Sequence, residues 1–225
     1  MKLSIVMPVR NEAAGIVQAL LPLQELRGAL ELIVVDGQSQ DATRLLAQPL
    51  ADQLLESSPG RARQMNTGAA AAQGDWLLFL HADTRLPDGF ISLLQEAQDS
   101  GADWGRFDVQ LEPSSALLRL VARMINLRSR LTGVCTGDQA LFLRRRLFEQ
   151  LGGYAEIPLM EDVELSKRLR RVNRPYCITT PLTTSSRRWQ QHGTLRTILL
   201  MWRLRLLYWL GVAPERLAES YRSTR

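Results

Sequence analysis

Three apolar segments of this chain end abruptly in polar residues, and each of them delivers an acidic side chain. The transitions are residues 76–80 into His81-Ala82-Asp83-Thr84, residues 3–7 into Pro8-Val9-Arg10-Asn11-Glu12, and residues 32–35 into Asp36-Gly37-Gln38-Ser39. A short apolar run bounded in this way is typical of a buried strand, and open α/β sheets bind ligands outside the carboxyl ends of their strands. The three segments therefore predict a carboxylate-lined site at one edge of a sheet.

Asp36 and Asp83 each lie at or just after the end of a predicted strand, and each has a structural and a ligand-binding interpretation. Asp36 either caps the following helix, where Asp is favoured, or accepts hydrogen bonds from a base or a ribose. Asp83 either closes a strand-end turn or binds Mg²⁺ or Mn²⁺, because one hard carboxylate with phosphate oxygens and water is a typical site for these ions. His81 is assigned no metal role. The sequence contains neither a GxGxxG fingerprint nor a P-loop.

Three further segments carry groups that suit an anionic ligand or a proton transfer. Residues 60–66 begin a helix with two arginines, a combination that favours anions; a solvated basic turn is the alternative. Glu161 and Asp162 open another helix, where acids are common for dipole reasons, but the pair also suits a general base. Residues 187–192 either pair with surface acids or reach over a diphosphate, and a metal role of His192 stays open.

The composition is that of an ordinary globular protein, with 45% hydrophobic and 23% charged residues in a chain of 225. A chain of this length buries a sizeable core, and we expect one domain over residues 1–225.

The net charge of +5 comes from arginine and suits a phosphorylated ligand, an anionic membrane surface or nucleic acid. The two cysteines show no metal-binding spacing, and no signal peptide or membrane span is recognisable, so we expect a cytoplasmic protein.

Residues 1–100 are expected to alternate between strands and helices. We expect strands at residues 3–8, 31–36, 52–56 and 75–80, and helices at residues 12–27, 41–50, 60–73 and 87–100. This alternation predicts right-handed crossovers and an α/β fold with a Rossmann-like, mostly parallel sheet flanked by helices. We expect this half of the chain to bind a nucleotide.

After residue 103 the alternation loosens. We expect strands at residues 104–111, 140–143 and 178–185, and helices at residues 114–132, 148–153, 162–172 and 195–210. In the helix at 114–132, four polar residues recur at four-three-four spacing and predict one polar stripe on an apolar body. These residues are Arg119, Arg123, Asn126 and Arg130. The second half of the chain is expected to complete the site.

Taken in order, these segments resemble the family 2 glycosyltransferases of the GT-A fold. The matching motifs are Pro8 to Glu12, Val34 to Asp41, Gly60-Arg61 with Asn66-Thr67-Gly68, His81-Ala82-Asp83, Thr136-Gly137-Asp138-Gln139 and Glu161 to Leu165. The resemblance covers nearly the whole chain and implies one GT-A domain, with an acceptor-binding half and C-terminal helix over residues 101–225. Residues 60–84 and 208–214 are similar to a small bacterial subgroup labelled arsenosugar-biosynthesis glycosyltransferases.

The resemblance implies transfer of one sugar, with inversion, from a nucleotide-diphosphate sugar to the hydroxyl of a small-molecule or lipid acceptor. The implied donor-binding residues are Pro8, Asn11 and Glu12 beside the nucleoside, Asp36 at the base or ribose, Arg61 in the nucleotide pocket, and Asn66 and Arg188 at further motif positions. Asp83 matches the last acid of the DxD motif and is assigned the divalent metal, Mg²⁺ or Mn²⁺. Asp162 matches the catalytic base, and Asp138 is placed near the acceptor. UDP is slightly favoured over GDP.

Two positions depart from the family pattern. His81 replaces the first acid of the DxD motif, so metal dependence is expected but is not secured by this motif. Ser185 replaces the glutamine of the QxxRW element, while Arg188 and Trp189 are retained. Because the intact element is associated with polymerising enzymes, this change favours a single transfer.

Two alternatives to a transferase remain. A sugar nucleotidyltransferase would carry a Gly-rich basic loop after its first strand, which residues 8–15 lack. A degenerate GT-A protein bound to a membrane surface is the other, since residues 195–210 are apolar and contain three aromatic side chains. Core packing or an oligomer contact explains that helix equally well, because Arg203 and Arg205 point to nearly opposite faces.

The partners of the chain are predicted only in part. Nucleic acid is not expected, because the basic residues are not interleaved with exposed aromatic residues. We expect a cytoplasmic location, with a peripheral contact to the inner face of the membrane left open. The oligomeric state is also left open.

Overall fold

A computed structural model describes residues 1–222; the side chains of residues 188, 192 and 222 lie outside that description. The strands of the described chain are β1 (Leu3–Val9), β2 (Leu30–Asp36), β3 (Gln53–Glu56), β4 (Trp76–Phe79), β5 (Thr84–Arg85), β6 (Trp104–Glu112), β7 (Phe142–Arg144) and β8 (Tyr176–Ser185). They form one sheet in the order β3-β2-β1-β4-β7-β6-β8-β5.

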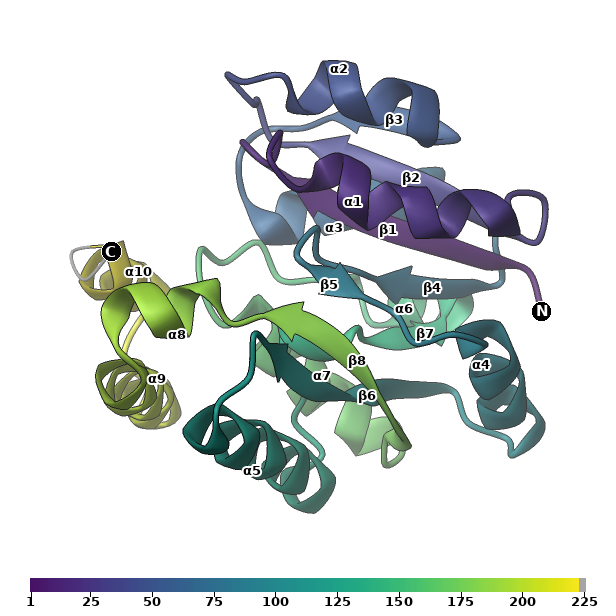
Figure 1. Ribbon diagram of the computed structural model, residues 1–225. Coiled ribbons are helices and arrows are strands. Elements are labelled where there is room, and N and C mark those ends of the chain that lie inside the picture. The colour runs from purple at the N-terminus through teal and green to yellow at the C-terminus, as the bar shows by residue number, and fades with distance from the viewer. Residues whose placement is uncertain (223–225) are drawn as a thin grey trace.

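Helices connect and cover these strands (Figure 1). The α-helices are α1 (Ile16–Leu20), α2 (Thr43–Ala47), α3 (Arg61–Ala71), α4 (Phe90–Asp99), α5 (Ala116–Thr132), α6 (Arg145–Gln150), α7 (Glu161–Val172), α8 (Arg187–His192), α9 (Thr194–Trp209) and α10 (Pro214–Arg222). The described residues also form the short 3-10 helices η1 (Leu21–Leu26), η2 (Gln48–Leu50) and η3 (Gly137–Gln139).

The sheet is mostly parallel, as the sequence predicts. β1 pairs in parallel with β2 and β4, β2 with β3, and β6 with β8. β7 runs antiparallel to both β4 and β6, and β5 runs antiparallel to β8. The α/β fold class with helices on both faces is therefore confirmed. After residue 103 the alternation loosens because β7 is inserted antiparallel between β4 and β6.

The strands of the first half are buried on both faces. Leu3, Ile5 and Met7 of β1 pack on one side with α1, α2 and α4, whereas Val6 packs on the other side with α3. This follows from the period of two along a strand, and a strand buried on both faces is typical of a parallel sheet covered by helices. The carboxyl ends of β1, β2 and β4 consequently open at one edge, where the predicted acids lie.

α5 is held to β6 by polar contacts. The side chain of Asn126 accepts a hydrogen bond from the backbone of Val109 at 2.9 Å and donates one back at 3.0 Å. Asp108 forms ion pairs with Arg106, which is fully buried, and with Arg130. Two residues of the predicted polar stripe thus serve as attachments to the sheet, and the outward side of α5 is left with exposed apolar residues.

Several helix bounds differ from the predicted ones. The helix expected at 12–27 begins at Ile16 and gives way to η1 at Leu21, next to Pro22 in the first turn of that 3-10 helix. Proline has no backbone N–H to continue an α-helical ladder, which explains the change. α8 and α10 were not expected from the sequence, because neither has a long apolar period.

Gly105 of β6 lies between β7 and β8, opposite Phe142 and Tyr176. A Cβ atom at this position would overlap the carbonyl oxygen of Tyr176 in β8 and the ring of Phe142 in β7. Only glycine allows β6, β7 and β8 to approach so closely at this point.

We predict that Gly105→Ala lowers the free energy of unfolding by about 1–3 kcal/mol, because the added methyl group forces the strands apart. Urea denaturation measures the change. Gly15→Ala is the matched control, since nothing lies within 4 Å of a Cβ atom there and its φ of −123° is open to alanine. Equal stability of Gly105→Ala and the unaltered chain would contradict this packing account.

Candidate functional site

The loops that follow β1 and β2 are joined by hydrogen bonds. The backbone N–H of Asn11 donates to Ser39 Oγ at 2.9 Å, and Asn11 Oδ1 accepts from the N–H of Gln40 at 2.8 Å. The N–H of Glu12 donates to Thr43 Oγ1 at 2.7 Å. Asn11 therefore fixes the two loops against each other, and this contact presents the side chain of Glu12 at the sheet edge.

Asp36 is fully buried at the end of β2 and uses only one of its carboxylate oxygens within the protein. Its Oδ2 atom accepts a hydrogen bond from the N–H of Ser39 at 2.9 Å, whereas its Oδ1 atom is buried and has no hydrogen-bond partner. The residue does not cap the next helix, because α2 begins at Thr43. A buried acceptor without a partner is costly, so a ligand donor at this position would be bound strongly.

Glu12 lies within a group of charged side chains that come from distant segments. Burial and the neighbouring carboxylate of Asp83 raise the pKa of Glu12, and the guanidinium groups of Arg187 and Arg61 act in the opposite direction. Loops after β1 and β4 and the starts of α3 and α8 thus meet at one place. Such a mixture of two carboxylates and two arginines can hold a cation and an anion together.

A divalent cation fits this group only with help from a ligand. Among residues 1–222, no three His, Cys, Asp or Glu side chains are grouped closely enough to hold a metal ion. Asp83 is exposed and has Glu12 beside it, so the protein supplies at most two carboxylates. Mg²⁺ is commonly bound in this way, by one or two carboxylates together with phosphate oxygens.

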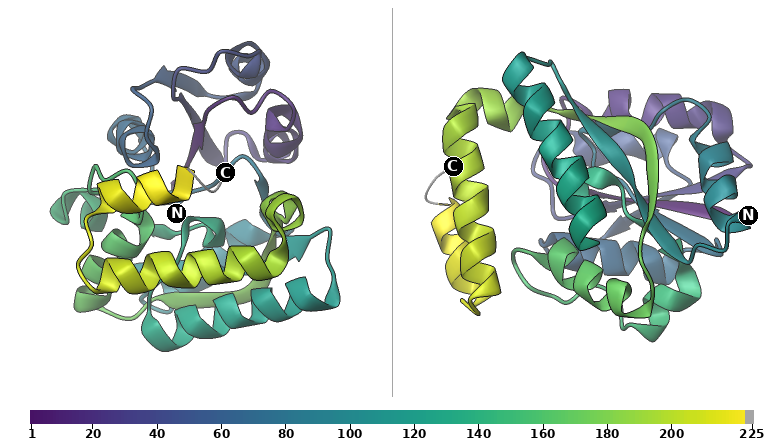
Figure 2. Two further views of the ribbon diagram at one scale, coloured as in Figure 1. Left: turned by 90° about the vertical axis from the view of Figure 1, so that its left-hand side faces the viewer. Right: turned by 90° about the horizontal axis from the view of Figure 1, so that it is seen from below.

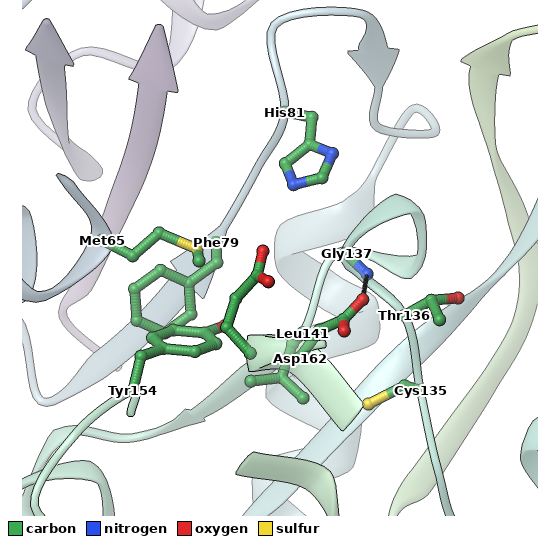
Figure 3. Close-up of a pocket in the computed structure, with 10 residues that line it drawn as sticks. Met65, Phe79, His81, Cys135, Thr136, Gly137, Leu141, Tyr154 and Asp162 are labelled. Atoms are coloured by element: carbon green, nitrogen blue, oxygen red, sulfur yellow. Dashed lines mark hydrogen bonds between the residues drawn. The ribbon is translucent and has the colours of Figure 1, made fainter. Parts of the chain in front are cut away.

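A pocket lies next to this charged group (Figure 3). Its lining residues are Met65, Phe79, His81, Cys135, Thr136, Gly137, Leu141, Tyr154, Glu161 and Asp162. The imidazole of His81 lies against Gly137, since a Cβ atom on that glycine would come 2.5 Å from His81 Cε1. The pocket combines an apolar floor with acidic side chains from the start of α7.

Asp162 is held in a fixed orientation at the start of α7. Its Oδ2 atom accepts a hydrogen bond from the N–H of Gly137 at 2.8 Å (Figure 3). Its Oδ1 atom accepts one from the N–H of Val163 at 2.7 Å. These two N–H donors fix the carboxylate, and lone pairs remain on its oxygens for a further hydrogen bond. The geometry suits a positioned general base.

Glu161 differs from its neighbour in its electrostatic environment. Burial and the charge of Asp162 raise the pKa of Glu161 to about 7, and the charge of Arg61 opposes the shift. The charge of Arg61 thus lowers the pKa of Glu161 as well as that of Glu12. Sequence reasoning placed Glu161 only beside the base and did not reveal its burial.

Asn66 contacts the pocket through another residue. Its amide group donates to the carbonyl oxygen of Tyr154 and accepts from the N–H of Tyr154, both at 2.9 Å. This pair of bonds positions Tyr154, whose ring lines the pocket. Pro8 lies at the end of β1 opposite Val35 of β2, at the same edge as Asp36.

A second positive group, formed by Arg128 and Arg205, lies near Asp162. The guanidinium of Arg128 is buried at its Nε and Nη2 atoms, which have no hydrogen-bond partner, and Asp138 Oδ1 is likewise buried without one. Burial and the charge of Arg205 lower the pKa of Arg128 to about 10, whereas Asp138 and Asp162 oppose the shift. Arg128 and Arg205 were not selected from the sequence, because an arginine within an amphipathic helix resembles a solvated one.

Arg188 and His192 belong to α8, and their side chains lie outside the described residues. The prediction that Arg188 binds the donor and the open question of His192 as a metal ligand therefore stay as they were. Arg187, the neighbour of Arg188, is described and reaches the charged group around Glu12.

The model of glycosyl transferase family 2 matches residues 4–151, which carry β1 to β7 and most of the residues described above. The chain belongs to glycosyl transferase family 2. The family resemblance predicted from the motifs is thereby confirmed, whereas the arsenosugar subgroup stays a prediction. A sugar nucleotidyltransferase finds no support in the matched family.

Curated relatives of this family 2 chain are themselves glycosyltransferases. The PGL/p-HBAD biosynthesis glycosyltransferase of Mycobacterium bovis (strain BCG / Pasteur 1173P2) is 32% identical over 170 residues, covering 67% of this chain and 62% of that protein. The probable glycosyltransferase YdaM of Bacillus subtilis (strain 168) is 27% identical over 198 residues, covering 75% of this chain and 46% of that protein. The chain therefore spans less than two thirds of the length of either relative.

Solved structures share the fold. TarS 1-349 of S. aureus in complex with UDP superposes with a TM-score of 0.67 at 16% identity, covering 82% of this chain and 60% of that one. The mannosyltransferase PcManGT of Pyrobaculum calidifontis, in complex with GDP-Man and Mn²⁺, superposes with a TM-score of 0.63 at 22% identity, covering 81% and 56%. The expected GT-A fold is confirmed.

We predict that Glu161→Gln flattens the pH dependence of stability. The pKa of Glu161 is raised in the folded chain, so its contribution is complete below the unfolded value near 4.5 and is lost as the pH rises through about 7. Between pH values of about 5 and about 8, the unaltered chain should therefore lose on the order of 2 kcal/mol more stability than Glu161→Gln. Urea denaturation at both pH values measures this, and parallel losses in the two proteins would contradict it.

Proposed function

We propose that this family 2 chain transfers one sugar from a nucleotide-diphosphate sugar to an acceptor hydroxyl, with inversion at the anomeric carbon and with a divalent metal. The observation that carries the proposal is the geometry of two carboxylates: Asp36 has a buried Oδ1 atom without a partner at the end of β2, and Asp162 is held in the pocket by the N–H of Gly137. A diphosphate at the sheet edge would then have its sugar end directed toward the pocket at the start of α7.

The donor is assigned to the edge formed by β1, β2 and β4. The free Oδ1 atom of Asp36 is available to a donor group of the base or ribose, with Pro8 and Asn11 beside it. Asp83, with Glu12 beside it, is the residue that would hold Mg²⁺ or Mn²⁺, and this ion would neutralise charge on the diphosphate. Neighbouring structures contain UDP, or GDP-Man with Mn²⁺, which supports this class of ligand; we place UDP ahead of GDP.

The reaction is a single displacement in which Asp162 takes the acceptor proton. The acceptor oxygen forms a bond to the anomeric carbon as the bond from that carbon to the diphosphate oxygen breaks, and the freed electron pair stays on the diphosphate. Arg61 and Arg187 stabilise the negative charge that grows on this leaving group. The hydrogen bond from Gly137 keeps the Asp162 carboxylate directed into the pocket.

The acceptor is assigned to the side of Asp162 that faces α5 and α9. Asp138 Oδ1 is a hydrogen-bond acceptor, and Arg128 Nε and Nη2 are hydrogen-bond donors. Each of these buried atoms lacks a partner within the described chain. Together they offer donors and acceptors to a polar acceptor, which is either a small molecule or a lipid head.

We predict that Asp162→Asn lowers the rate of nucleotide release from the accepted UDP-sugar roughly 100- to 10,000-fold, because the amide cannot take a proton. UDP-glucose and UDP-GlcNAc are the first donors to assay, with water or added alcohols as acceptors. Affinity for the donor, measured by calorimetry, should stay nearly unchanged.

Glu161→Gln is the matched control, since it removes the adjacent carboxylate and keeps that of Asp162. It should retain most of the activity. The assignment of the base would be wrong if Asp162→Asn turned over normally while Glu161→Gln was inactive, a result that would transfer the role to Glu161.

A further inference from the structure

α5 and α9 each carry a row of exposed apolar side chains. On α5 the row is Leu117, Leu120, Met124, Leu127 and Leu131, and on α9 it is Leu195, Leu199, Trp202, Leu206 and Trp209. The exposed fraction of these residues ranges from 39% for Leu117 to 75% for Trp209. The spacing alternates between three and four, so each row runs along one side of its helix. Scattered exposed leucines are ordinary, but two such rows are not.

The two helices lie side by side (Figure 2). Ile198 of α9 and Trp189 of α8 pack against the inner side of α5, in a cluster with Leu118, Val121 and Ala122. The inner side of α9 packs through Leu204 on Met160 and Val163 near the start of α7. Both inner sides are therefore covered, and both outer rows face away from the body of the protein. We call the two outer rows the apolar surface.

The charge of these helices selects the kind of partner. α5 and α9 contain seven arginines and no aspartate or glutamate, whereas the whole chain has a net charge of only +5. Arg119, Arg123, Arg196 and Arg203 are exposed. A second copy of the same surface would bring arginines against arginines, so charge disfavours a symmetric dimer.

We infer that the apolar surface docks on a lipid bilayer that contains anionic lipids. Leucine and tryptophan side chains enter the interface between head groups and acyl chains, and arginines bind the phosphates around them. No helix in residues 1–222 is long and apolar enough to cross a membrane, so the contact is a peripheral one. The inner side of α9 carries Arg205 near Asp162, so docking brings the reaction pocket close to the bilayer.

The test is co-sedimentation of the purified chain with vesicles, which requires neither nucleotide nor acceptor. The chain should bind vesicles of equal parts phosphatidylcholine and phosphatidylglycerol, and not vesicles of phosphatidylcholine alone. Leu206→Glu should weaken binding roughly tenfold or more, because a charge replaces an exposed apolar group that the bilayer would bury. The pair Arg196→Ser and Arg203→Ser should weaken it roughly 10- to 30-fold.

Leu45→Glu is the matched control. Leu45 is 74% exposed on α2, at the opposite end of the molecule from α9, and the substitution changes the net charge by the same amount (Figure 1). Its binding should equal that of the unaltered chain. Equal loss in Leu45→Glu and Leu206→Glu would overturn the inference, as would absent binding or binding without lipid preference. A dimer in sedimentation equilibrium that Leu206→Glu dissociates would overturn it in favour of a second copy.

Discussion

Crowding of carboxylates at the carboxyl edge of the sheet is the constraint around which the site is arranged. Glu12 lies near Asp83 and Glu161 beside Asp162, and in both cases burial and the neighbouring acid raise the pKa of the glutamate. Such groups are stable in a folded chain only where positive charge or N–H donors compensate them. Arg61 compensates both glutamates, and a divalent cation is the further partner that we propose for the outer pair.

The position of this sheet edge could be predicted from the sequence. The antiparallel strands of the sheet and the buried charged side chains around the pocket could not. Apolar runs ending in Asp36 and Asp83 locate the strand ends, because a buried strand and its polar exit are local features. The antiparallel strands β5 and β7 depend on pairing across long sequence separations, which no local pattern contains. Burial of Glu161 and of Arg128 is likewise set by tertiary packing. The raised pKa of Glu161 and the missing hydrogen-bond partners of Arg128 therefore have no signal in the sequence.

α9 connects the chemistry to the proposed bilayer contact. Its inner side holds Leu204 in a buried cluster and Arg205 near the acids of the pocket, whereas its outer side carries the exposed row with Trp202 and Trp209. From sequence alone this helix suits core packing, an oligomer contact and a membrane contact equally. The structure separates its two sides, because only one of them is covered by the rest of the described chain.

Calorimetric titration with UDP and with GDP, each with and without Mn²⁺, tests the central claim that the edge of the sheet is a metal-assisted nucleotide-diphosphate site. The account predicts that one nucleotide, UDP in the first place, binds the chain in the presence of Mn²⁺. Asp83→Ala should remove the effect of Mn²⁺ and weaken binding roughly 10- to 100-fold, the loss expected for one charge-assisted contact. Failure of both nucleotides to bind with Mn²⁺ would contradict the account and would indicate a degenerate relative that binds no donor.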